Sequence, residues 1–228
     1  MALLFVDNSS KIIRILLQTR DFYTEYHVFN SINKSNSIIY YIDQLLSSNK
    51  LTSQDITKVA YINSGLSFTG LRLALSMLIA ISYVNRSQIF PIDPYVSILL
   101  QHLKQNPILH SRYYAVVLPS NDHRTSLAIV EYDSNNSKVL NKYNINVNDA
   151  STIITPDEYS LIDDITIINP LPAQITQRFL QNIKLQHQKK DITFRMVQSA
   201  NFELSYISQL ILNNQFAAVD LNSADLLY

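Results

Sequence analysis

The chain has 228 residues but only two glycines, Gly65 and Gly70, and both lie in the segment 61–72. An average protein of this length contains roughly fifteen glycines. The other turns must therefore be made by other residues, and we expect Asn, which tolerates the left-handed backbone region at a cost, to make most of them. Where glycine is kept, the backbone needs a positive φ or the close approach of another backbone or a ligand. The segment 61–72 is therefore the first place to look for function.

The composition predicts a globular protein that associates with a partner. Hydrophobic residues make up 47% of the chain and charged residues 16%, so it can bury a substantial core and is not disordered. Eighteen basic and eighteen acidic residues cancel, which disfavours electrostatically driven binding to nucleic acid or membranes. A low charge content at zero net charge favours association with another chain.

Several kinds of chemistry are excluded or disfavoured by residue types. The absence of cysteine excludes disulfides, thiolate catalysis and Cys-ligated metals. The histidines form no His-x-x-x-His pair, which would bring two imidazoles to one helical face. They are His27, His102, His110, His123 and His187. We interpret them as surface or capping residues and expect no catalytic residue, no bound cofactor and no metal site.

Two further features concern localisation. The segment 1–7 lacks a basic region and meets an acidic residue too early for a signal peptide. The uncharged stretch 73–85 is shorter than the roughly twenty residues that span a bilayer. We therefore expect a soluble, cytoplasmic protein with no membrane partner.

The first half of the chain predicts three strands in a meander, followed by helix, strand, helix and helix. The expected strands are 3–6, 11–19, 22–29 and 58–62, and the expected helices are 38–46, 71–84 and 95–104. Asn36 or Ser37 is the expected N-cap of the first helix. Thr52 and Asp55 have the spacing of a capping box for one helical turn.

The second half predicts a second meander. The expected strands are 112–118, 126–132, 139–147 and 164–168, and the expected helices are 172–188 and 200–212. The links between the first three strands contain Asn, which would supply positive φ. The two halves therefore share a topology without sharing a sequence, and we expect an α/β protein with two subdomains, residues 1–108 and 109–228.

The glycine segment has three interpretations. Gly65 and Gly70 have the spacing of a Walker A loop, but Leu71 and Arg72 stand where that loop needs Lys and Ser or Thr. No side chain would then reach the β- and γ-phosphates or hold Mg²⁺. In a second interpretation, Gly65 takes a positive φ and Gly70 lets the helix pack closely on the sheet. The third interpretation is a family motif.

The residues from Ser67 to Arg72 read Ser-Phe-Thr-Gly-Leu-Arg, after a strand and before an apolar helix. This segment resembles the Gly-Pro-Gly-Ser-Phe-Thr-Gly-Leu-Arg signature of the TsaB (YeaZ) family. The opening strand, residues 3–9, resembles the family's Ile-Leu-Ala-Leu-Asp-Thr-Ser strand, and residues 34–46 keep the apolar spacing of the helix that follows. The resemblance covers residues 3–105, with Ser64-Gly65-Leu66 replacing Gly-Pro-Gly. The motif-loop residues are Gly65, Ser67, Phe68, Thr69 and Gly70.

The resemblance implies an actin-like ATPase (ASKHA) fold of two ribonuclease-H-like subdomains. TsaB proteins are non-catalytic partners of a larger homologue, TsaD, to which they bind through helices of the N-terminal subdomain. With TsaE they install threonylcarbamoyl on N6 of adenosine 37 in tRNAs that read ANN codons. The resemblance thus implies an accessory subunit that binds a TsaD-like homologue, with a TsaE-like ATPase as a further partner, an indirect tRNA contact, and a homodimer when the partner is absent.

The expected partner face lies on the helix 71–84, which is apolar nearly all round and must be buried by its own fold or by another chain. One stripe faces the sheet and consists of Leu71, Ala74, Leu75, Leu78 and Ile81. The opposite stripe, with Tyr41 and Gln44 of the preceding helix, is the expected interface: Arg72, Ser76, Ile79, Ala80 and Tyr83. The alternative is that the second half of the chain covers this face.

Two other functions stay open. The first is a nucleotide-binding phosphotransferase with the same fold, in which Asp7 would be the Mg²⁺-side aspartate, although we interpret Asp7 as a turn former. Asp163 and Asp164 are adjacent on a strand, point oppositely and form no carboxylate pair. The second is a self-associating scaffold whose apolar helices pair across a two-fold axis.

Overall fold

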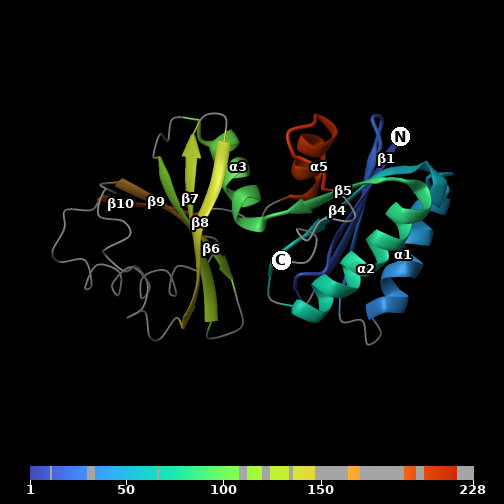
Figure 1. Cartoon of the computed structure of the whole chain (residues 1–228), viewed down its shortest axis with the longest axis horizontal. Coiled ribbons are helices and arrows are strands. Elements are labelled where there is room, and N and C mark those ends of the chain that lie inside the picture. The colour runs from blue at the N-terminus through green and yellow to red at the C-terminus, as the bar shows by residue number, and fades with distance from the viewer. Residues whose placement is uncertain are drawn as a thin grey trace. The chain divides into compact units, whose positions relative to one another are not determined.

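The structure is a computed structural model that describes residues 1–10, 12–29, 34–65, 67–107, 112–119, 124–133, 136–146, 164–169, 193–198 and 203–219. The chain divides into two compact units (Figure 1). One consists of Met1–Pro94 and Glu203–Tyr228, and the other of Tyr95–Phe202. The boundary expected from the sequence fell after residue 108. By contacts, residues 95–108 belong to the second unit, and the C-terminal residues return to the first.

The first unit contains a five-stranded sheet in the order β3-β2-β1-β4-β5. Its strands are β1 (Ala2–Asp7), β2 (Ile13–Gln18), β3 (Tyr23–Val28), β4 (Ile56–Ile62) and β5 (Gln88–Ile92). The first three form the predicted antiparallel meander, and β4 runs parallel to β1. Every residue of β1 is buried, as expected for a central strand covered on both faces.

The strand β5 was not predicted, because Pro91 lies within it. Proline has no amide hydrogen to donate to a ladder, so it normally argues against a strand. Here β5 is at the edge of the sheet, parallel to β4, where one side of the strand needs no partner. Near its start, the Ile89 carbonyl accepts a hydrogen bond of 2.9 Å from the Val219 amide.

Helices cover both faces of this sheet. They are α1 (Lys34–Ser48), α2 (Phe68–Asn85) and α5 (Leu204–Leu212), with a short 3₁₀ turn, η1 (Ser53–Asp55). The helix α1 packs on β2 and α2 on β4 and β5, while α5 contacts β1 and β2. The core cluster with α1 and α2 contains Leu4 and Val6 of β1, so α1 and α2 share one face. Figure 1 shows α5 on the opposite face of the sheet.

The helix starts differ from the predicted ones. The helix α1 already includes Asn36 and Ser37, so neither is the N-cap. The helix α2 begins at Phe68 because the side chain of Ser67 caps it, accepting a hydrogen bond of 3.1 Å from the Gly70 amide. The predicted capping box is present: the Thr52 amide donates to the Asp55 carboxylate at 2.8 Å. This bond lowers the pKa of Asp55.

The expectation that Asn makes the glycine-free turns is wrong for most of the positive φ angles in the described part of the chain. These angles occur at Lys50, Arg86 and Asn214. Arg86 is the C-cap of α2, and its amide donates to the Ser82 carbonyl. Helices commonly end with one left-handed residue that satisfies the last carbonyls, and a non-glycine residue there costs about 1–2 kcal/mol. Helix geometry, not residue type, sets these positions.

The second unit repeats the order of the first sheet. Its strands are β6 (Tyr113–Pro119), β7 (Arg124–Asp133), β8 (Asn136–Asn146), β9 (Asp164–Asn169) and β10 (Thr193–Gln198). The order is β10-β9-β6-β7-β8, with β6, β7 and β8 antiparallel and β9 and β10 parallel to β6. The helix α3 (Pro94–Gln105) precedes it. The predicted α/β fold with two meanders is confirmed. The predicted helix 172–188 and Asp163 lie outside the described residues.

Candidate functional site

The N-terminus of α2 lies directly against the C-terminal end of β1. A Cβ atom on Gly70 would be 2.1 Å from the carbonyl oxygen of Asn8, and the Asn8 side-chain amide donates to the Gly70 carbonyl at 3.0 Å. The Ser67 amide donates to the Ser9 carbonyl at 3.0 Å. Gly70 is therefore required by the close packing of helix on strand, which confirms the second interpretation of the glycine segment for this residue.

Gly65 faces the same β1–β2 turn. A Cβ atom on it would be 2.5 Å from the Cβ atom of Ser9. Its φ of +158° is close to extended backbone, so the lack of space around it matters more than its dihedral angle. Both glycines thus make room for the residues that follow β1, and neither position needs a ligand to explain it.

Asp7 is fully engaged by its own chain. Its buried carboxylate accepts hydrogen bonds from the Ser9 amide at 2.9 Å and the Ser9 hydroxyl at 2.6 Å. The guanidinium of Arg14 donates to it through Nε at 3.0 Å and also through Nη2. The negative charge is therefore neutralised and the turn after β1 is fixed. This geometry supports the interpretation of Asp7 as a turn former.

Three buried oxygen atoms near this turn have no hydrogen-bond partner. They are Asn8 Oδ1, Asn63 Oδ1 and Ser64 Oγ. Asn8 follows β1 and Asn63 follows β4, so these atoms belong to the carboxyl ends of two neighbouring parallel strands. Buried polar atoms of this kind usually bind an ordered water molecule. The two Asn side-chain oxygens can only accept hydrogen bonds, and Ser64 Oγ can accept or donate one, so the cluster fits a water molecule better than a phosphate group.

The inner face of α2 agrees with the predicted stripe. Ala74, Leu75 and Leu78 are buried in the core cluster, while Leu71 and Ile81 are half-buried. Fully burying a side chain of this kind contributes about 1.5–3 kcal/mol. These residues fix α2 on the sheet.

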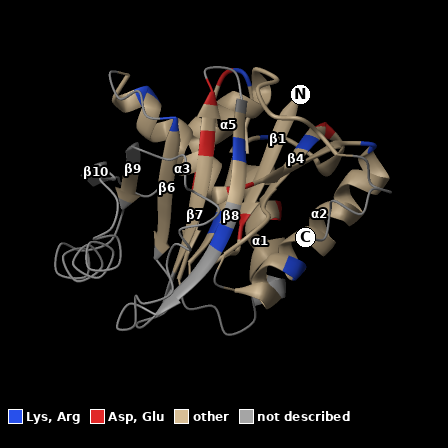
Figure 2. Cartoon of the chain, turned by 60° about the vertical axis from the view of Figure 1, so that its left-hand side comes forward, with Lys and Arg blue, Asp and Glu red and all other residues tan. Residues whose placement is uncertain are grey.

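Among the described residues, the outer side of α2 is largely exposed. Of the predicted interface residues, Arg72, Ser76 and Ala80 are exposed, Ile79 is half-buried, and Tyr83 is 78% exposed. Arg72 is the single charged residue of α2, and its guanidinium lies 4.0 Å from the centre of the Phe68 ring. Figure 2 shows how sparse charges are along the described part of the ribbon. Arginine and aromatic residues with few other charges are typical of a protein interface.

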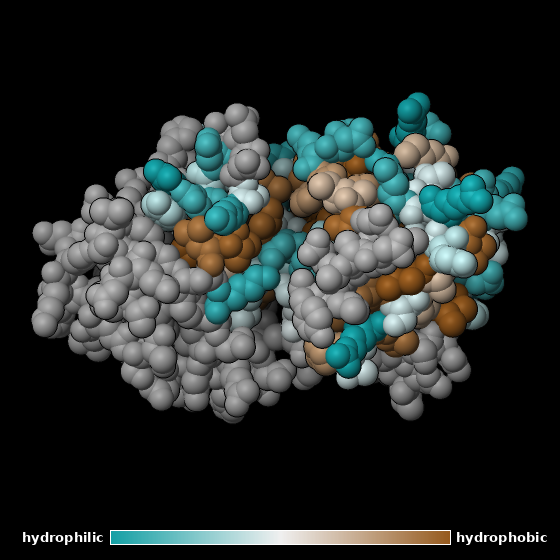
Figure 3. Space-filling model, viewed as in Figure 1, coloured by the Kyte–Doolittle hydropathy of each residue, from teal (hydrophilic) through white to brown (hydrophobic). Residues whose placement is uncertain are grey.

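The neighbouring helix α1 extends this surface. Gln44 is exposed, as predicted, and Tyr41 is half-buried between the rings of Tyr26 and Tyr40. The sequence reasoning missed other large apolar side chains that the structure exposes: Ile39, Tyr40, Phe68 and Val84. These residues lie outside the buried stripes of their helices, and this helical position was the sequence signal that could have identified them as exposed. We define the outer helix face as these residues together with the predicted ones. Figure 3 shows hydrophobic surface over this region.

By length and composition alone, α2 could also cross a membrane, because the helix is 18 residues long with a mean hydropathy of 1.4. The sequence analysis considered only the uncharged residues 73–85, which are too few to span a bilayer, but the helix begins at Phe68 and is therefore longer. Only 28% of α2 is buried inside the structure. However, Gly70, Ala74 and Leu78 tie one side of it to the sheet. We therefore interpret α2 as a layer of the fold with one bare side.

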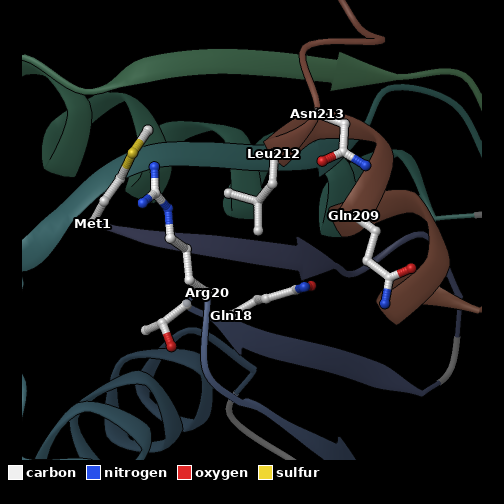
Figure 4. Close-up of a pocket in the computed structure, with 7 residues that line it drawn as sticks. Met1, Gln18, Arg20, Gln209, Leu212 and Asn213 are labelled. Carbon is white, nitrogen blue, oxygen red and sulfur yellow. The ribbon is translucent and has the colours of Figure 1, made fainter.

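A cavity of about 420 Å³ lies apart from the predicted residues (Figure 4). It is lined by Met1, Gln18, Thr19, Arg20, Gln209, Leu212 and Asn213. The amide of Gln18 at its floor is buried and already accepts a hydrogen bond from Ser208. Nothing in its lining brings a nucleophile together with a base.

The perturbed ionisable groups of the first unit have structural causes. Lys58 is buried, which lowers its pKa, and its Nζ donates to the Ile211 carbonyl and to Asn214 Oδ1, each at 3.1 Å. It therefore anchors the C-terminal end of α5 to β4. Burial raises the pKa of Tyr61 to about 12.

The described histidines are also structural. The Nε2 atom of His27 lies 2.7 Å from Glu25 Oε1. His102 on α3 is buried, which lowers its pKa. No group of three or more His, Asp or Glu side chains among the described residues could hold a metal ion. His110, His123 and His187 lie outside the described residues.

Comparison with solved structures places this arrangement of two sheets and helices in the actin-like ATPase fold class. Matches include a protein from Pseudomonas aeruginosa with similarity to peptidase YeaZ (TM-score 0.62, 8% identity, 98% of this chain and 96% of that chain). YeaZ from Pseudomonas aeruginosa matches with a TM-score of 0.58 and 8% identity, over 95% of both chains. A ROK family protein from Streptococcus pneumoniae in complex with sucrose has a TM-score of 0.54, 12% identity, and coverage of 94% and 100%.

At sequence level there is no corresponding match. No protein-family model matches the chain, and no curated protein matches it either. At these low identities the structural neighbours establish the fold and not the activity. The chain is therefore an actin-like (ASKHA) fold protein whose arrangement is similar to that of YeaZ.

Proposed function

We propose that this chain is a TsaB-like, non-catalytic subunit that binds a TsaD-like transferase. In this role it supports the N6-threonylcarbamoyladenosine modification at position 37 of tRNA. The observation that carries the proposal is the bare outer helix face, on a fold that the chain shares with YeaZ. The motif from Ser67 to Arg72, at the start of that same helix, supports it.

The chemistry of the outer helix face fits a protein partner. Tyr83 and Val84, at one end of α2, are each 78% exposed, and Phe68 at the other end is 59% exposed. Covering apolar surface contributes about 25 cal/mol per Å², so these side chains are expected to supply much of the binding energy. Small residues between them, Ser76 and Ala80, would let a partner helix approach closely.

The other end of the site supports the accessory role. The Asp7 carboxylate is held by Ser9 and Arg14, and the space around Gly65 and Gly70 is filled by the β1–β2 turn. In this proposal the partner performs the chemistry and contacts the tRNA. A TsaE-like ATPase is a further partner of the complex, which we expect in the cytoplasm.

Co-purification with the TsaD-like homologue of the same organism tests the proposal. We expect the full-length chain to elute with that homologue at micromolar concentrations, and Ala80→Glu, which buries a charge in the interface, to elute separately. Gln209→Glu places the same charge at an exposed position of α5 and is the matched control. Separate elution of the wild-type chain would overturn the proposal.

The alternative is a phosphotransferase, which the ROK family neighbour keeps open as a fold relation. It predicts that the isolated chain binds Mg·ATP. The lack of any glycine after Gly70 argues against it, because no glycine-rich loop is left to hold the adenosine. Titration calorimetry with Mg·ATP separates the two functions. Saturable binding of Mg·ATP at a one-to-one stoichiometry would favour the enzyme over the accessory subunit.

A further inference from the structure

The cavity beside α5 contains an arginine that no acidic side chain neutralises. Every residue that lines the cavity belongs to the first unit. Arg20 is the single charged side chain of this lining, and none of these described residues is Asp or Glu. Asp21, the next residue in the chain, is exposed and does not line the cavity. Among the described residues, Arg20 forms no ion pair. The cavity therefore presents an uncompensated positive charge.

The turn between β2 and β3 fixes the backbone at Arg20. The Thr19 amide donates to the Phe22 carbonyl at 2.9 Å. The Thr19 hydroxyl accepts hydrogen bonds from the Asp21 and Phe22 amides, at 3.2 and 3.3 Å. Figure 4 shows the Arg20 side chain extending from this turn past β1 toward Met1. Because the backbone that carries the guanidinium is already ordered, less entropy is lost when a ligand binds to it.

Gln18 supplies a second donor at the floor of the cavity. This residue is only 7% exposed, and its Oε1 atom accepts a hydrogen bond from the Ser208 hydroxyl of α5. Among the described residues, its Nε2 atom has no hydrogen-bond partner, although it is not sealed from the cavity. Amide groups at buried positions are normally hydrogen-bonded. The Nε2 atom is therefore a free donor for a molecule in the cavity.

The C-terminal end of α5, which forms another wall, does not repel an anion. The last carbonyls of a helix carry a partial negative charge. Here the Leu210 carbonyl accepts from the Gln215 amide at 2.9 Å, and the Ile211 carbonyl accepts from the Asn214 amide at 3.1 Å. The Ile211 carbonyl also accepts from Lys58 Nζ at 3.1 Å, which adds a positive charge at the same helix end. This wall is therefore compatible with a negatively charged ligand.

The rest of the cavity suits a small molecule with an apolar part. Figure 4 shows Leu212 of α5 pointing into the space that Arg20 and Gln18 border. Leu212 is half-buried, so it offers apolar surface that a ligand would cover. The volume of about 420 Å³ lies near the lower end of the range typical of small-molecule sites, roughly 300–1,000 Å³.

We infer that this cavity binds a small monocarboxylate with a short apolar chain. The Arg20 guanidinium donates two N–H groups to the two carboxylate oxygens, and Gln18 Nε2 donates to one of them. The apolar chain lies against Leu212. The planar arginine fork matches a carboxylate in this way. A doubly charged phosphate would need a second cation, which the lining lacks because Arg20 is its single charged side chain.

This site is independent of the outer helix face, so it does not depend on the proposed function. The helix α5 lies on the opposite face of the sheet from α1 and α2. The full chain can therefore be tested for a carboxylate without a partner protein, and failure of the partner complex would leave this test unaffected.

Titration of the ¹⁵N-labelled full chain with butyrate, followed by two-dimensional NMR, tests the site. We expect saturable shift changes at residues 18–20 and 211–213, with a dissociation constant of about 1 mM for so small a probe. Butyramide has nearly the same size but no charge, and it should bind at least about tenfold more weakly. Inorganic phosphate should not displace butyrate.

Variants assign the binding to the two donors. Arg20→Gln removes the charged donor and should raise the dissociation constant for butyrate by about tenfold or more. Arg20→Lys keeps the charge but loses the fork, so its constant should lie between the two. Gln18→Met keeps the side-chain length and should weaken binding about threefold or more. Arg86→Gln removes the same charge from another exposed position of the first unit and should leave the constant unchanged.

Three results would overturn the inference. The first is the absence of saturable shifts with butyrate up to about 50 mM. The second is equal binding of butyramide or inorganic phosphate, and the third is an equal loss in Arg20→Gln and Arg86→Gln. Circular dichroism of each variant establishes that it is folded. If Gln18→Met unfolds, the Arg20 variants still decide the result, because Arg20 is exposed.

Discussion

The two sides of α2 are both apolar, but they have opposite environments. Ala74, Leu75 and Leu78 are buried against the sheet, whereas Tyr83 and Val84 are each 78% exposed. On the inner side, apolar residues recur at helical spacing, with Ser82 as a buried polar exception. On the outer side they alternate with Arg72 and small residues. The comparison teaches that composition alone does not separate core from contact surface, and that stability and binding should be assigned to different sides of one helix.

The largest expected effect on folding comes from the inner side. Leu78→Ala removes a side chain with 0% exposure from the core cluster and leaves a cavity. We expect a loss of about 2–5 kcal/mol in the free energy of unfolding. Urea denaturation of the isolated chain measures it. A loss below about 0.5 kcal/mol would mean that the inner side does not anchor the helix.

Gly70→Ala tests the contact at the start of the helix. Alanine normally stabilises a helix relative to glycine, but here its Cβ would be 2.1 Å from the Asn8 carbonyl oxygen. The backbone must shift, and we expect a net destabilisation of about 1–3 kcal/mol by the same denaturation measurement. A more stable variant would contradict the close packing of α2 on β1.

Ser67→Ala removes the N-cap of α2. The Ser67 hydroxyl accepts from the Gly70 amide at 3.1 Å, and its loss leaves that amide without a partner at the helix start. We expect a cost of about 1 kcal/mol in thermal unfolding, with Ser67→Asp close to wild type. Equal losses in both variants would show that the cap does not stabilise the helix.

The smallest expected effect on folding comes from the outer side. Tyr83→Ala truncates an exposed side chain, so the free energy of unfolding should change by less than about 0.5 kcal/mol. A loss as large as that of Leu78→Ala would show that the outer side belongs to the core, and the comparison of the two sides would fail.

Periodicity in the sequence was enough to predict both sides of α2 and most of the fold. Every strand of the two meanders was predicted, because each is bounded by turn residues and contains apolar, aromatic or β-branched side chains. The strand β5 could not be predicted from the sequence, since Pro91 is tolerated only at a sheet edge. The position of a strand within its sheet is a property of the tertiary structure. The same limit applies to positive φ at Lys50 and Arg86, which helix ends impose.

The candidate site was predicted in part. Arg72, Ser76, Ala80 and Tyr83 are exposed as expected, because a helix has a fixed period. The buried polar contacts around the candidate site depend on partners that are far away in the sequence. The Asn8 side chain after β1 donates to the Gly70 carbonyl of α2, and Lys58 of β4 reaches the end of α5, which no local pattern indicates.

The most direct test of the central claim is the dissociation constant of the complex between this chain and the TsaD-like homologue, measured for wild type and Tyr83→Ala. An interface anchor contributes about 2 kcal/mol or more, so we predict a dissociation constant raised by about thirtyfold with unfolding unchanged. An unchanged dissociation constant in a folded variant, or no complex with the wild-type chain, would contradict the account.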